Sequence, residues 1–133
     1  MMTNRNSNEM QAVEIVHAFQ NHLVARDFES WFSLFSEDTV FEFPYAPGGY
    51  TQRLVGIEEI RNYVTELFKL LKIQSFSTPE LIVSGEQIVA EYTCNGEVLG
   101  TGKSYYQKYI SVIHTRDGKI TLFKDYWNPT LLF

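Results

Sequence analysis

A chain of 133 residues of which 44% are apolar can form one hydrophobic core but not two, and its body is too apolar to be disordered. The formal net charge of −5, without any cluster of basic residues, excludes nucleic acid and anionic membrane surfaces as natural partners. No apolar run approaches the roughly 20 residues of a membrane span. From the length we expect one domain over residues 1–133, with residues 1–7 flexible.

Two features of the sequence indicate a cytoplasmic protein. The single cysteine, Cys94, rules out an internal disulfide framework and fits a reducing compartment. The polar residues 1–8 lack the apolar segment of a signal peptide. We therefore expect the chain to stay in the cytoplasm.

The first half of the chain has the apolar spacing of three helices. The first helix has Asn8 as its expected N-cap and ends near Arg26. The second helix has Asp27 as its expected N-cap, and the third helix begins after Gly56. The residues three and four apart that would form their buried faces are Ala12, Val16, Phe19 and Leu23, then Phe28, Trp31, Phe32 and Phe35, then Ile57, Ile60, Val64, Leu67 and Leu71. The segment between the second and third helices predicts a strand over 39–43 and a Pro- and Gly-rich loop over 44–50.

After Pro79 the apolar period changes to two, which is typical of strands. Hairpin turns are expected at Asn95-Gly96 and at 116–118. The strand that follows Asn95-Gly96 is expected to be broken or bulged at Gly100 and Gly102. The predicted strands are 81–84, 88–94, 104–114 and 119–127. Helices followed by hairpin-connected strands favour an α+β fold with the helices on one face of an antiparallel sheet.

Three pairs of segments carry a resemblance to a known family. They are Asp27-Phe28 with 34–38, residues 43–47 with 54–60, and residues 117–120 with 125–129. In this order and spacing they resemble the nuclear transport factor 2-like superfamily, which includes ketosteroid isomerases, and within it the branch of SnoaL-like polyketide cyclases and phenazine biosynthesis A/B proteins.

The resemblance implies a cone-like curved sheet, antiparallel to mixed, that encloses a pocket together with three N-terminal helices, the cystatin-like α+β roll. It also implies binding of a small molecule, without a cofactor. A homodimer paired through the convex face of the sheet is implied as well, where Ile110, Val112 and Tyr126 would be exposed.

The residues of ketosteroid isomerase chemistry are absent from the matching positions. An isomerase of this fold needs an aspartate base before the proline that ends the first strand, and here that position is Phe43. The position of the first-helix tyrosine holds Phe19. The position of the late-strand acid falls at Tyr109 or Ile110, and neither residue is acidic. The chain is therefore not expected to be a true ketosteroid isomerase.

Asp125 is the strongest candidate for a catalytic group. The resemblance implies that a carboxylate on the last strand acts as the acid/base, and strand alternation places Phe123, Asp125 and Trp127 on one face. If that face lines the pocket, desolvation raises the pKa of the carboxyl into a range useful for proton transfer. The alternative is a surface aspartate paired with Lys124 or another cation.

Several side chains are candidates for substrate binding. Gln107 and Tyr109 share a strand face, from which both could hydrogen-bond a ligand. The alternative is that Gln107 is an exposed amide and Tyr109 packs against an aromatic ring of the neighbouring strand. His22 lies one turn from Phe19, and Tyr45 with Tyr50 could close the pocket as a lid or cover the core. The full predicted set is Phe19, His22, Tyr45, Tyr92, Gln107, Tyr109, Phe123 and Trp127. The three scattered histidines indicate no metal site.

Two functions remain open at this level. The first is a SnoaL-like enzyme that performs cofactor-free isomerase-, cyclase- or dehydratase-type chemistry on a small hydrophobic or carbonyl-containing metabolite, with Asp125 as the acid/base. The second is a protein of the same fold that binds a small ligand without turnover. The orientation of Asp125, toward the pocket or toward solvent, discriminates between them.

Overall fold

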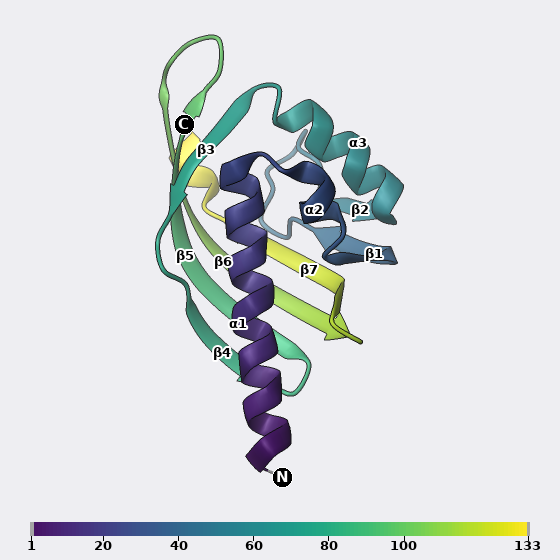
Figure 1. The fold of residues 1–133 in the computed structure, drawn as a ribbon. Coiled ribbons are helices and arrows are strands. Elements are labelled where there is room, and N and C mark those ends of the chain that lie inside the picture. Colours follow the sequence, from purple (N-terminus) through teal and green to yellow (C-terminus); the bar gives the residue numbers. More distant parts are fainter. Residues whose placement is uncertain (1, 133) are drawn as a thin grey trace.

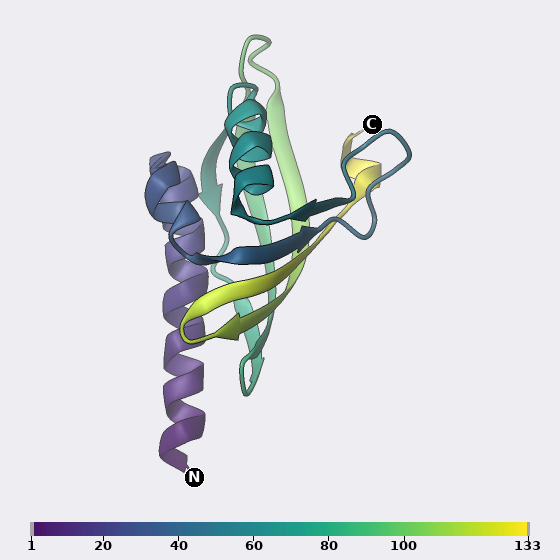
Figure 2. The ribbon, with the colours of Figure 1, turned by 90° about the vertical axis from the view of Figure 1, so that its right-hand side faces the viewer.

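The computed structural model describes residues 2–132, and the side chains of residues 7–131. In this part of the chain, three α-helices lie on one face of a curved seven-stranded sheet that does not close into a barrel (Figure 1, Figure 2). The helices are α1 (Met2–Ala25), α2 (Phe28–Phe32) and α3 (Ile57–Leu67). The strands are β1 (Phe35–Glu42), β2 (Arg53–Val55), β3 (Leu71–Phe76), β4 (Glu80–Ser84), β5 (Gln87–Val98), β6 (Ser104–Arg116) and β7 (Lys119–Trp127), followed by a short 3-10 helix over Pro129–Leu132.

The sheet is mixed, with the strand order β2-β1-β7-β6-β5-β3. Strand β1 runs parallel to β7, and the other pairs are antiparallel. The long strand β5 pairs with β4 over residues 87–91 and with β3 over residues 94–98, so its two halves carry different neighbours. The predicted α+β cone of curved mixed sheet and helices is confirmed. No helix among the described residues has the length and apolarity to traverse a bilayer.

The core lies between the helices and the concave face of the sheet. The ring of Phe123 in β7 is sandwiched between Phe19 of α1 and Phe41 of β1, with centroid distances of 4.8 and 4.6 Å and interplanar angles of 10° and 11°. Trp31 of α2 packs against Phe19 at 5.4 Å. Such ring contacts each add about 0.5–1.5 kcal/mol beyond area burial, so this cluster fixes α1 and α2 relative to β7.

The helix ends differ from the sequence prediction at three places. Helix α1 begins at Met2, so the expected N-cap at Asn8 is wrong, and whether residues 1–7 are flexible stays a prediction. Asp27 does cap α2, accepting from the backbone N–H of Ser30 at 3.2 Å. Phe35 and Leu71 continue the helical spacing of their neighbours but begin β1 and β3 instead. Helical spacing alone could not show that tertiary pairing ends each helix early.

The dipeptide Asn95-Gly96 lies inside β5 and is not a hairpin turn, so that prediction is wrong. The turn falls between β5 and β6, where Gly100 and Gly102 have φ angles of 92° and 73°. Gly96 is required for a different reason, because β3 approaches it closely. A Cβ atom there would overlap the backbone oxygen of Lys72.

We expect Gly96→Ala to destabilise the protein, because the contact is with backbone of β3 that cannot rotate away. Overpacking of this kind costs about 1–3 kcal/mol, and urea unfolding followed by circular dichroism measures it. Gly48→Ala is the matched control, because no atom lies within 4 Å of a Cβ there. Equal stability of the two variants would contradict the account of β5.

Candidate active site

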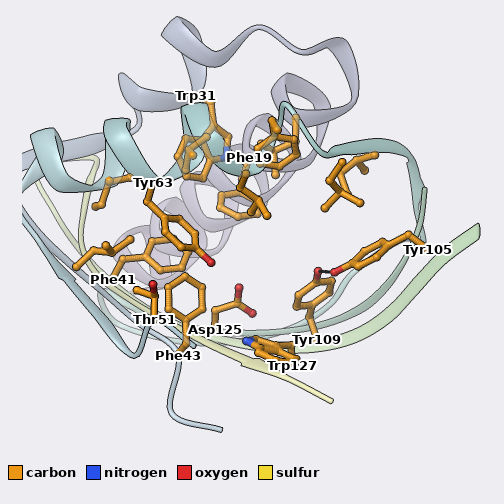
Figure 3. Close-up of a pocket in the computed structure, with 18 of the residues that line it drawn as sticks. Phe19, Trp31, Phe41, Phe43, Thr51, Tyr63, Tyr105, Tyr109, Asp125 and Trp127 are labelled. Atoms are coloured by element: carbon orange, nitrogen blue, oxygen red, sulfur yellow. Dashed lines mark hydrogen bonds between the residues drawn. The ribbon is translucent and has the colours of Figure 1, made fainter. Parts of the chain in front are cut away.

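A cavity of about 230 Å³ lies between the helices and the concave face of the sheet. This volume is just below the range of about 300–1,000 Å³ for ligand pockets, so it suits a small molecule. Its walls are apolar and aromatic side chains, among them Phe19, Trp31, Phe43 and Trp127 (Figure 3). None of the described residues that line it is Lys, Arg or His, and Asp125 is their only carboxylate.

Asp125 extends from β7 into this cavity (Figure 3). The residue as a whole is half-buried, and it lines the cavity. Its buried Oδ1 has no hydrogen-bond partner among the described residues, and none of their cations pairs with it. Burial without compensation disfavours the charged form, and it raises the pKa of Asp125 from 3.8 to about 7.

Two hydroxyl groups from other elements line the cavity near Asp125. Tyr63 comes from α3 and Thr51 from the loop before β2 (Figure 3). Burial, and secondarily the charge of Asp125, raise the pKa of Tyr63, so its hydroxyl stays protonated. A neutral tyrosine can donate to a ligand oxygen or accept a proton relayed from the carboxyl.

Among the other described tyrosines of the cavity, Tyr50 lies edge-on to Trp127, so it is at the cavity as predicted, and the other three are hydrogen-bonded to side chains. Tyr92 and Ser111 lie 2.7 Å apart, oxygen to oxygen, and Ser111 is directly opposite Asp125 on the neighbouring strand. Tyr105 and Tyr109 of β6 form a second pair, also at 2.7 Å. Burial is the main cause that raises the pKa of Tyr92, Tyr105 and Tyr109.

The structure brings five of the predicted site residues to the cavity. They are Phe19, Tyr92, Tyr109, Asp125 and Trp127. The alternation predicted for β7 is observed, since Asp125 and Trp127 line the cavity while Lys124 and Tyr126 do not. The alternative of a surface Asp125 paired with Lys124 does not occur. The roles of these five residues in binding or catalysis stay predictions.

Four predicted binding residues do not line the cavity. Phe123 is fully buried because the rings of Phe19 and Phe41 cover both its faces. His22, one turn from Phe19 on α1, is half-buried but does not line the cavity. Tyr45 is 62% exposed and lies edge-on to Tyr126, beside a groove outside the cavity, so it is not a lid.

Gln107 has a structural position that the sequence did not reveal. It is 1% exposed, and its Oε1 accepts from the backbone N–H of Asn128 at 2.9 Å and of Lys108 at 3.0 Å. It thereby holds the end of β7, just after Trp127. Both predicted positions of Gln107, as a ligand contact in the cavity and as an exposed amide, are therefore wrong.

Sequence reasoning missed Tyr63, Tyr105 and Thr51 as cavity residues. Tyr63 stands three residues after Ile60, on the helical stripe that the apolar spacing defined, and Tyr105 shares the strand parity of Tyr109. Both signals were present in the sequence. Thr51 had none, because it follows an irregular loop.

Other side chains lie at the isomerase positions or outside the site. Phe43 and Phe19, at the isomerase positions, line the cavity as apolar rings. Glu42 is in an ion pair with Arg53, Oε2 to Nε 3.5 Å, across β1 and β2. Cys94 is buried, which raises the pKa of its thiol to about 12, so it is no thiolate nucleophile at neutral pH.

The chain is similar to known proteins over nearly its whole length. A family model for the SnoaL-like domain matches residues 16–123, so Asp125 lies just beyond the matched segment. YesE of Bacillus subtilis is 41% identical over 124 residues, which cover 92% of this chain and 84% of that protein. A PhzA/B-like protein of Pseudomonas aeruginosa is 34% identical over 127 residues, which cover 90% of this chain and 86% of that protein.

Among solved structures, the crystal structure of a proposed isomerase from Bacillus subtilis is similar in fold and sequence. Its TM-score is 0.88 at 40% identity, with 93% of this chain and 91% of that chain covered. The cone of helices and sheet described above is therefore shared with an experimentally observed relative.

Proposed function

We propose that this chain, which belongs to the SnoaL-like domain family, is a cofactor-free acid/base enzyme for a small, largely apolar molecule that carries a carbonyl group. Asp125 is the proton-transfer group of this proposal. The observation that carries it is a lone carboxyl with no ion-pair or Oδ1 hydrogen-bond partner among the described residues, in a cavity with aromatic walls. An unpaired buried carboxyl costs stability, and perturbed pKa values of this kind cluster at functional sites.

The proposed step is a proton transfer next to the carbonyl group of the substrate. The carboxylate of Asp125 takes a proton from the carbon beside the carbonyl, and the electron pair of the C–H bond forms the enolate, whose charge moves to the oxygen. The protonated Asp125 then returns the proton to the same or another atom, so the step needs no oxidant or reductant. A pKa of about 7 makes both forms of the carboxyl available near neutral pH.

The side chains around Asp125 supply orientation and electrostatic stabilisation in this proposal. Tyr63 and Tyr109 are neutral donors on two walls of the cavity, and Trp127 is the next cavity residue on β7. Donors fixed near a developing enolate oxygen stabilise it more strongly in an apolar cavity than in water. Gln107 acts indirectly, by holding the end of β7 at Asn128.

Hydrogen–deuterium exchange tests this activity without knowledge of the natural substrate. We expect the protein in D₂O to accelerate deuterium incorporation at C2 of 1-tetralone, a small bicyclic ketone, measured by proton NMR. The exchange rate should rise with pH and level off above about 7, because only the ionised Asp125 is a base. Asp125→Asn should lower the catalysed rate at least about 100-fold.

Glu42→Gln is the matched control for this experiment. It also removes one carboxylate, but that carboxylate is paired with Arg53 and does not line the cavity. Its exchange rate should equal that of the unmodified protein. Binding of the ketone without exchange above the buffer rate, or an Asp125→Asn variant of full activity, would favour the alternative of a ligand-binding protein without turnover.

We also propose that two copies pair through the face of the sheet that the helices leave uncovered. The helices of the described chain lie on the concave side (Figure 2), and Ile110 on the other side is 45% exposed, with Val112 and Tyr126 half-buried beside it. Strand register brings Ile110 directly opposite Tyr126. Apolar side chains gathered on an open sheet face are typical of interaction surfaces.

Sedimentation equilibrium at micromolar concentration should give the mass of a dimer. Ile110→Glu should shift the protein to monomer, because it places a charge in the interface. Val13→Glu is the control, since Val13 is 42% exposed on α1 instead. A monomer of the unmodified protein at that concentration would refute the dimer.

A further inference from the structure

Four hydroxyl groups of the cavity lie on two sides of Asp125. Asp125 lies between Tyr63 and Thr51 on one side and the Tyr105–Tyr109 pair on the other (Figure 3). Most of the remaining wall is apolar or aromatic. The proposed chemistry uses Asp125 as the base and Tyr109 as a neutral donor, but gives no task to Tyr105 or to the contact between the two tyrosines.

The two tyrosines of the pair lean toward each other along one strand. They are four residues apart in β6, so about 13 Å of extended backbone separates their Cα atoms, and yet their hydroxyl oxygens lie 2.7 Å apart. Gln107, midway between them, is almost completely buried. The dashed line in Figure 3 marks the hydroxyl contact, which faces the cavity.

The pair keeps one proton that no described residue accepts. Two hydroxyl groups carry two protons, and their mutual hydrogen bond uses one, whichever group donates. Neither hydroxyl has a further hydrogen bond in the described part of the chain. A donor that already takes part in one hydrogen bond is polarised and donates more strongly.

The pair is held in place and remains neutral. The ring of Tyr109 stacks on Tyr92 with a centroid distance of 5.5 Å and an interplanar angle of 28°. Burial raises the pKa of both tyrosines of the pair, so they stay protonated at any ordinary pH. The other pair, Tyr92 with Ser111, is enclosed more deeply, with Tyr92 5% and Ser111 0% exposed. It is therefore less exposed to a ligand than the Tyr105–Tyr109 pair.

The charges near the cavity restrict what can accept from the pair. None of the described lining residues is a cation, and the adjacent Arg26 is engaged with the backbone oxygens of Phe68 and Leu71 instead. An anionic ligand would lose its hydration without a counter-charge and would meet the carboxylate of Asp125. The acceptor is therefore a neutral oxygen.

We propose that the hydroxyl pair of Tyr105 and Tyr109 is a binding subsite for a neutral carbonyl or ether oxygen of the ligand, while the lack of a lining cation and the carboxylate of Asp125 make the cavity select against carboxylates and phosphates. This inference rests on the proposed function for the identity of the cavity as a ligand site. It adds Tyr105 as a specificity-determining residue and fixes one end of the ligand relative to Asp125.

The test compares three probes of similar ring skeleton by NMR titration. They are 1-tetralone, tetralin, which lacks the oxygen, and tetralin-1-carboxylate at pH 8. The unmodified protein should bind the ketone about threefold to tenfold more tightly than the hydrocarbon, the range expected for one neutral hydrogen bond, and should bind the carboxylate least. The double variant Tyr105→Phe/Tyr109→Phe should bind ketone and hydrocarbon equally.

Two control variants separate this inference from others. Tyr106→Phe removes a hydroxyl from the opposite face of β6, does not touch the cavity, and should leave the ketone preference intact. Asp125→Asn should also keep the preference, so a failure of the proposed catalysis is distinguishable from a failure of the subsite. The inference is overturned if the unmodified protein shows no preference for the ketone, if the double variant retains it, or if the carboxylate binds as tightly as the ketone.

Discussion

The desolvation of a single carboxyl group is the constraint on which the site depends. Asp125 lies in an apolar cavity without a cation, and this burial alone raises its pKa to about 7. A nearby Lys or Arg would have paired with the carboxyl and lowered its pKa. The cost of burying an acid in this way is several kcal/mol at most and is paid by the rest of the core. A function for the acid explains why the fold tolerates that cost.

The scaffold places this carboxyl through strand alternation and ring packing. Phe123, two residues earlier in β7, is held between Phe19 and Phe41, which fixes the strand against α1 and β1. Two residues later, Trp127 faces the same cavity, and Gln107 holds the backbone just beyond it. The carboxyl is thus supported on both sides along its strand, and rigid support of this kind is what proton transfer requires of a catalytic group.

Much of this arrangement could be predicted from the sequence, because period-two alternation and helical spacing are local properties. They predicted the face of Asp125 and the buried faces of the helices. Other features depend on distant segments. Gly96 belongs to a strand because β3 packs against it, although Asn-Gly favours a hairpin. The contact of Tyr105 with Tyr109 depends on side-chain rotamers, and whether His22 reaches the cavity depends on how α1 is rotated against the sheet.

Direct titration of Asp125 tests the central claim most simply. In protein labelled with ¹³C at aspartate carboxyl carbons, the Asp125 signal is identified by its absence from the spectrum of Asp125→Asn. Its chemical shift should change with a midpoint near pH 7, as expected for a buried and unpaired acid. A midpoint near the ordinary value of 3.8 would show that the carboxyl is solvated or paired in solution, and would contradict the account.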